Sequence, residues 1–179
     1  MKRISGSTLP VAGAAAACLF VSIPFTAGRA AGEASPIYGV TIPDGYRQWE
    51  VVAPSEELGK LDELRVILGN PIAIDAYRKG TLPFPDGTIL VKVGWKRQPS
   101  AVDDAALGSQ QAFVPGVRSE VADVQIMVKD SKKYASTAGW GFGKFLEGKP
   151  LDKATHEACF ACHAAHVAAH DFVFTRYAR

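Results

Sequence analysis

Two cysteines and a histidine lie close together near the end of the chain. The segment reads Cys159-Phe160-Ala161-Cys162-His163. In a C-x-x-C-H pattern, two thioether bonds hold a haem and the histidine ligates its iron. A redox dithiol would need a βαβ setting and a zinc site a second ligand pair, and the sequence offers neither. We therefore predict one covalently bound haem c, tethered by Cys159 and Cys162, with His163 as the axial ligand.

The other side of the iron decides what such a site does. His156, His166 and His170 lie on the same predicted helix as His163, at helical spacing. A histidine one turn from His163 lies beside the porphyrin rather than across it, so we interpret His166 and His170 as packing, propionate or surface groups. Met127 lies in a predicted strand and fits core filler better than an axial ligand. We expect an open or weakly occupied sixth position, which favours binding or converting a small molecule.

The N-terminus has the pattern of a secretory signal peptide. Lys2 and Arg3 precede an apolar, alanine-rich run over 11–25 and then small residues up to Ala30. That run is too short for a membrane-spanning helix, which needs about 20 apolar residues. We predict that residues 1–30 are removed and that the protein is exported to the periplasm. A lipoprotein anchored through Cys18 is the alternative, but the alanines before it lack the large aliphatic residue that such sites favour.

Residues 31–179 are enough for a single domain with a hydrophobic core. The chain carries 20 basic and 18 acidic residues, and removing three basic residues and no acidic one with the leader leaves 17 against 18. This near-neutral balance gives no support for binding nucleic acid or an anionic membrane. We expect no stable membrane insertion after cleavage.

Hydrophobic periodicity and turn residues predict a mainly β domain with a few short helices. A helical turn leading into a strand is expected at 45–52, and a polar loop over 98–111. The other predicted strands are 61–68, 88–96, 120–129 and 139–146. The predicted helices are 71–80, 130–135 and a C-terminal one from Asp152 or Thr155 to about Ala169.

The predicted strands present two different faces, because side chains alternate along a strand. One face predicts an ordinary core: Leu64, Val66, Leu68, Ile89, Val91, Val93, Trp95, Val124, Ile126 and Val128. The other mixes charged and apolar residues: Arg65, Ile67, Leu90, Lys92, Val121, Asp123, Gln125 and Met127. This second face is amphipathic rather than plainly solvent-facing.

The order of five segments resembles the cytochrome P-460 family, which also contains the cytochromes c′-beta. These segments are PDGYRQWEVV at 43–52, LDELRVIL at 61–68, PDGTILVKVG at 85–94, VKDSKKYA at 128–135 and CFACHAAHVAAHDFVFTRY at 159–177. The resemblance implies an α+β, mainly β fold: an antiparallel β-sheet with flanking short helices and a C-terminal haem-binding helix. It further implies a periplasmic protein with five-coordinate iron and a distal pocket on the sheet side. Dimers are usual in such proteins, although no residue here demonstrates a homodimer.

The resemblance also assigns roles to two residues of the amphipathic face. Lys92 in TILVKVG matches a lysine whose amine bonds to a porphyrin meso carbon in the enzymes of the family. Arg65 in DELRVIL matches a pocket arginine that donates hydrogen bonds to a bound N–O ligand or holds a propionate. A solvated strand lysine and a surface salt bridge are the alternatives for these two residues.

The enzymes of the family oxidise hydroxylamine, and this oxidation releases protons. The resemblance therefore also implies an acidic group near the substrate as their acceptor. Asp123 and Glu120 are the candidates, although Gln125 stands where a carboxylate would be expected. The cytochromes c′-beta instead cap the iron with phenylalanines, for which Phe84 and Phe113 are the candidates.

The resemblance implies the first two of three candidate functions, and Met127 suggests the third. The first is oxidation of hydroxylamine or a related nitrogen oxide, with electrons leaving to a soluble partner cytochrome and with Lys92, Arg65 and Asp123 as catalytic candidates. The second is binding of nitric oxide without turnover. The third is plain electron transfer with Met127 on the iron.

Overall fold

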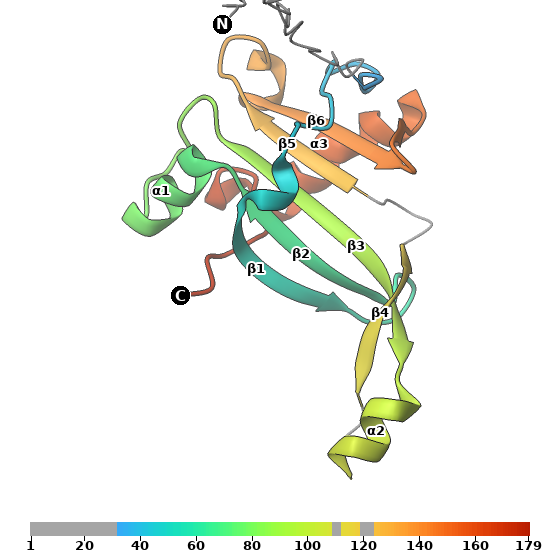
Figure 1. Cartoon of the computed structure of the whole chain (residues 1–179). Helices are drawn as coiled ribbons and strands as arrows, with labels where there is room; N and C mark the ends of the chain where they lie inside the picture. Colours follow the sequence, from blue (N-terminus) through green and yellow to red (C-terminus); the bar gives the residue numbers. More distant parts are fainter. Residues whose placement is uncertain (1–31, 109–111, 119–123) are drawn as a thin grey trace, which may run out of the picture. The chain divides into compact units, whose positions relative to one another are not determined.

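The computed structural model describes residues 32–108, 112–118 and 124–179. Their strands form one antiparallel sheet in the order β1-β2-β3-β5-β6-β7, and β4 pairs with β3 beside this path (Figure 1). The strands are β1 (Glu50–Glu57), β2 (Glu63–Gly69), β3 (Ile89–Pro99), β4 (Phe113–Arg118), β5 (Val124–Lys129), β6 (Trp140–Leu146) and β7 (Lys149–Pro150). The helices are α1 (Pro71–Lys79), α2 (Ala101–Leu107) and α3 (Lys153–Val167). The predicted fold, a mainly β antiparallel sheet with short helices and a C-terminal helix, is confirmed.

The first helix begins and ends where the sequence predicts. Asn70 caps it by accepting the Ala73 N–H at 3.0 Å, and Pro71 occupies the first turn. Gly80 ends it in a left-handed conformation with φ of 66°, which glycine adopts without steric cost. No helix of the described residues has the length and apolar character needed to cross a membrane.

Two local predictions are wrong. Part of the loop expected over 98–111 is α2. The Ser100 hydroxyl caps its start, and its first turn contains Asp103 and Asp104. Serine and aspartate favour helix starts as well as loops, so composition alone could not separate the two. The helix expected over 130–135 is a turn followed by a 3-10 helix, Ala135–Thr137. In addition, β4 was not predicted; with β3 it extends beyond the rest of the sheet and carries α2 (Figure 1).

The two faces of the sheet have the predicted characters over the described residues. On the apolar face, Val91, Val93, Val124 and Ile126 are buried. Tyr134 covers this face so closely that a Cβ added to Gly141 would overlap its ring. On the opposite face, the strand register aligns one row of side chains across β2, β3, β5 and β6: Ile67, Lys92, Gln125 and Lys144.

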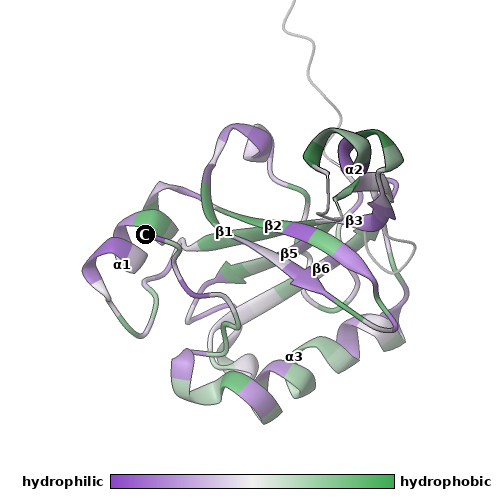
Figure 2. Cartoon of the chain, turned by 90° about the horizontal axis from the view of Figure 1, so that it is seen from below, coloured by the Kyte–Doolittle hydropathy of each residue, from purple (hydrophilic) through white to green (hydrophobic). Residues whose placement is uncertain are grey.

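The helix α3 runs beneath the sheet beside β6, as Figure 2 shows. Asp152 caps its start by accepting the Thr155 N–H at 2.8 Å. His156 is fully buried; its Nδ1–H donates to the Asp152 carbonyl at 2.8 Å and its Nε2 accepts the Lys144 N–H at 3.0 Å. Both ring nitrogens of His156 are therefore satisfied, and the ring ties α3 to the sheet.

Replacing His156 by leucine tests this tie. The substitution leaves the Lys144 N–H and the Asp152 carbonyl without their ring partners in a buried place. We expect the free energy of unfolding to fall by about 1–3 kcal/mol, measured by chemical denaturation. The matched control is His166→Leu on the exposed side of the same helix, with an expected change within about 0.5 kcal/mol. Equal losses in the two variants would contradict the role given to His156.

Candidate haem site

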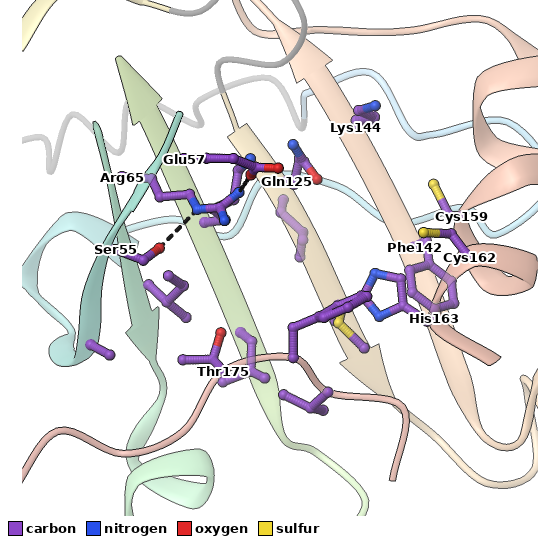
Figure 3. Close-up of a pocket in the computed structure, with 18 of the residues that line it drawn as sticks. Ser55, Glu57, Arg65, Gln125, Phe142, Lys144, Cys159, Cys162, His163 and Thr175 are labelled. Carbon is purple, nitrogen blue, oxygen red and sulfur yellow. Dashed lines mark hydrogen bonds and ion pairs between the residues drawn. The ribbon is translucent and has the colours of Figure 1, made fainter. Parts of the chain in front are cut away.

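A cavity of about 710 Å³ lies between the amphipathic sheet face and the segment running from α3 to the C-terminal residues (Figure 3). The sheet contributes charged and apolar side chains from five strands, among them Ser55, Glu57, Glu63, Arg65, Ile67, Leu90, Lys92, Gln125, Met127, Phe142 and Lys144. The opposite wall consists of Cys159, Cys162, His163 and residues 173–176. The cavity thus brings the C-x-x-C-H motif together with both residues assigned from the strand motifs, Arg65 and Lys92.

His163 is oriented by a single backbone contact. Its Nδ1–H donates to the Phe172 carbonyl at 2.7 Å, which leaves Nε2 as the nitrogen free to ligate a metal. Burial lowers the pKa of His163, although the contact with Phe172 opposes this effect. The lowered pKa favours the neutral imidazole, the form that binds metal ions. The ring centroids of Phe142 and Phe174 lie 5.1 and 4.9 Å from that of the imidazole, so the two rings flank it.

The two cysteines precede His163 on α3 and carry free thiols. Cys159 is half-buried and Cys162 is exposed, and both line the cavity. Burial raises the pKa of the Cys159 thiol. Both thiols thus lie on the same side of the cavity as His163 (Figure 3).

On the sheet side, Lys92 and Arg65 share a buried carboxylate. The Lys92 Nζ lies 2.9 Å from Oε2 of Glu63, and the Arg65 guanidinium lies 3.7 Å from the same oxygen. Arg65 also donates to the Ser55 hydroxyl at 2.8 Å and pairs with Glu57 at the rim (Figure 3). The solvated-lysine alternative does not describe Lys92, whose side chain is only 17% exposed.

Glu63 is a buried acidic residue of the cavity wall that the sequence analysis did not single out. It is 1% exposed, and Gly94 on β3 leaves room for it, because a Cβ at that position would overlap its Oε1. A signal exists in the sequence: Glu63 stands two residues before Arg65, so strand alternation places both on one face. The acids favoured from sequence, Asp123 and Glu120, belong to a different predicted strand.

Burial lowers the pKa of the Lys92 amine, and this effect outweighs the opposing contribution of its hydrogen bond and charge interaction with Glu63. Arg65 adds to the lowering through charge repulsion. A lower pKa increases the fraction of neutral amine, the form whose lone pair can bond to carbon.

The other candidates lie in different places. Asp123 and Glu120 fall outside the described residues. Gln125 is paired with Lys92 between the neighbouring strands β5 and β3, and it lines the cavity beside it. Phe84 and Phe113 do not line this cavity: Phe84 packs against Tyr77 and Trp140, and Phe113 lies under the Arg97 guanidinium.

The remaining methionine and histidine candidates divide between cavity and surface. Met127 faces the cavity from β5, half-buried. His166 is exposed on α3, and His170 lies in the 3-10 turn after that helix, where its Nδ1 is 2.9 Å from the Val173 carbonyl. Neither histidine lines the cavity.

The residues present fit a haem. The cavity volume is within the range of about 300–1,000 Å³ usual for small-molecule and cofactor sites. Cys159 and Cys162 would hold the macrocycle and His163 the iron, with apolar side chains of the sheet against the ring.

Comparison with known proteins agrees with this interpretation. The family model described as Cytochrome P460 matches residues 43–175, which contain the three cavity residues of the C-x-x-C-H motif as well as Glu63, Arg65 and Lys92. No curated protein matches the chain. Proteins of this family bind haem and are typically exported. The match spans most of the chain, which therefore belongs to the cytochrome P460 family and is a haem-binding cytochrome.

Proposed function

We propose that the protein is an exported cytochrome with one covalently bound haem c that binds and oxidises hydroxylamine or a related small nitrogen oxide. The observation that carries this proposal is the buried carboxylate of Glu63, paired with Lys92 and Arg65, in the same cavity as His163. Electrons would pass to a soluble partner cytochrome, and residues 1–30 would direct export. Oxidation of hydroxylamine releases protons that need an acceptor, and a carboxylate in the cavity can serve as one, whereas binding of a gas needs no such acceptor.

A bound haem would supply an iron that holds a small nitrogen ligand and accepts its electrons. The chain's own residues would divide the other tasks. Cys159 and Cys162 tether the macrocycle, and His163 holds the iron through Nε2. The haem would thus be fixed against α3, and the cavity wall on β2 and β3 would be left to the ligand.

Glu63 is the proposed proton acceptor. Its carboxylate is buried and close to two cations, so it is shielded from bulk water while it faces the cavity. Arg65 supplies hydrogen bonds to the oxygen of the ligand, since its guanidinium has five N–H donors in a fixed fork and does not lose its proton. Asp123 remains a candidate for the onward transfer of protons.

Binding of nitric oxide without turnover is the second candidate function. The ion pair between Lys92 and Glu63 favours it, because an ammonium held in an ion pair has no lone pair with which to bond to the porphyrin. The absence of Phe84 and Phe113 from the cavity wall weighs against it, because these were the residues expected to cap the iron. Plain electron transfer is supported only by Met127 on the cavity wall.

A covalent bond between Lys92 and the porphyrin is the first test. We expect mass spectrometry of a protease digest of the purified haem protein to show the Lys92 peptide joined through the haem to the peptide containing Cys159 and Cys162. Lys92→Arg should abolish this species. The matched control is Lys96→Arg, four residues along the same face of β3, which should retain it. A wild-type digest in which the Lys92 peptide is always free would contradict the enzyme and favour the binder.

The role of Glu63 is tested with Glu63→Gln, which keeps the shape and removes the basic carboxylate. We expect hydroxylamine oxidation to slow by about 100-fold or more, as general-base contributions usually imply. The Lys92 cross-link should still form, because removing Glu63 takes away a contact that raises the pKa of the amine.

Glu57→Gln is the control for this variant. Glu57 is also paired with Arg65 but lies at the rim with 39% of its side chain exposed, so we expect less than about a tenfold change in rate. Wild-type turnover in Glu63→Gln would show that protons leave by another route.

A further inference from the structure

The chain turns sharply after α3 at two residues with left-handed backbone conformations. Asp171 has φ of 46° and Phe172 has φ of 63°. Aspartate tolerates this region, but a bulky aromatic residue rarely adopts it and does so only where the surroundings fix it. Phe172 is also the residue whose carbonyl accepts the His163 N–H. The backbone conformation of Asp171 and Phe172, called the corner below, therefore determines where the carbonyl that accepts the His163 N–H lies.

A buried ion pair holds the corner from the sheet side. Lys129 is the last residue of β5, and its Nζ donates to both carboxylate oxygens of Asp171 at 2.8 and 3.0 Å. It also donates to the Ala138 carbonyl at 3.1 Å and lies over the Trp140 ring. The two side chains are only 7% and 9% exposed, so water hardly screens their attraction.

The same carboxylate fixes a third segment. Oδ2 of Asp171 accepts the backbone N–H of Phe84 at 2.8 Å, so the corner is tied to the loop after α1 as well as to β5. Two backbone hydrogen bonds close the corner itself, from Phe172 N–H to Val167 and from Val173 N–H to His170. Residues 171–173 are thus held by contacts on several sides. Within the described residues, Lys129 is the only charged side chain that donates to the Asp171 carboxylate.

A buried ion pair is by itself weak evidence for stability, because the cost of desolvating both charges offsets their attraction. What distinguishes this pair is its position, one residue from the carbonyl that orients His163. In metal sites, the group that accepts the second N–H of a ligating histidine fixes the ring and increases the electron donation of the other nitrogen.

We propose that the Lys129–Asp171 ion pair is a positioning device for the axial imidazole. It holds the Asp171–Phe172 corner so that the Phe172 carbonyl keeps its short hydrogen bond to His163, and it thereby stabilises the ferric state of a haem ligated there. The inference rests on the proposed ligation of iron by His163.

The test uses the full-length haem protein and two variants, Asp171→Asn and Lys129→Met. Loosening the contact between His163 and Phe172 should make Nε2 a weaker electron donor. We expect the iron–histidine stretching band of the ferrous protein to move to lower frequency and the ferric-to-ferrous equilibrium to shift about tenfold towards ferrous. That shift corresponds to a rise of about 59 mV in the one-electron midpoint potential.

Three further variants keep the test decisive. Lys129→Arg retains the charge and should stay close to wild type in both readouts. The double variant Lys129→Met/Asp171→Asn leaves no unpaired buried charge, so it should fold even where a single variant does not, and it should still show both shifts. Val93→Ala lowers stability from the opposite face of the sheet, because Val93 is 1% exposed and does not line the cavity, and it should leave both readouts unchanged.

Two results separate failure of this inference from failure of the proposed ligation. An unchanged stretching band and potential in Asp171→Asn and in the double variant, with haem bound, would overturn the inference and leave the ligation intact. A His163→Ala variant whose ferrous spectrum equals that of wild type would overturn the ligation itself, and the inference with it.

Discussion

The hydrogen bond from His163 to the Phe172 carbonyl is the contact on which the rest of the site depends. It determines that Nε2 rather than Nδ1 of His163 faces the cavity. Without this contact, nothing would fix the orientation of the imidazole relative to Cys159 and Cys162. The bond joins the helix to the segment that follows it, so the position of that segment determines the orientation of the ring. His156 has the complementary role of anchoring the start of α3 to β6.

The sheet side of the cavity, opposite this imidazole, contains a buried charge whose desolvation opposes folding. A carboxylate as buried as that of Glu63 loses its hydration, and an amine and a guanidinium close to it offset that loss only in part. Gly94 is the local device that makes space for it. Replacing such a group with apolar side chains is often neutral or stabilising, so its presence in this cavity agrees with the proposed catalytic role.

Much of this arrangement follows from sequence because period-2 alternation is a strong geometric rule: it suffices to place Arg65 and Lys92 on one face. The same rule places Glu63 there, but a glutamate on a strand gives no sign of burial until the room left by Gly94 on the neighbouring strand is known. The Lys129–Asp171 pair could not have been predicted from sequence, because only the tertiary fold brings the two residues together. The local sequence also does not indicate the left-handed backbone of Asp171 and Phe172. The helix α2 was missed because its capping residues are also loop residues.

The proposed haem is tethered at Cys159 and Cys162, ligated by His163, and open on the side of the charged sheet face. Its most direct test is the absorption spectrum of the purified, dithionite-reduced protein before and after carbon monoxide is added. We expect a five-coordinate ferrous haem that binds carbon monoxide and remains attached to the chain after denaturation and acid–organic extraction. A six-coordinate low-spin ferrous spectrum that carbon monoxide does not change, or a protein that carries no haem after expression with the maturation machinery for c-type cytochromes, would contradict the claim.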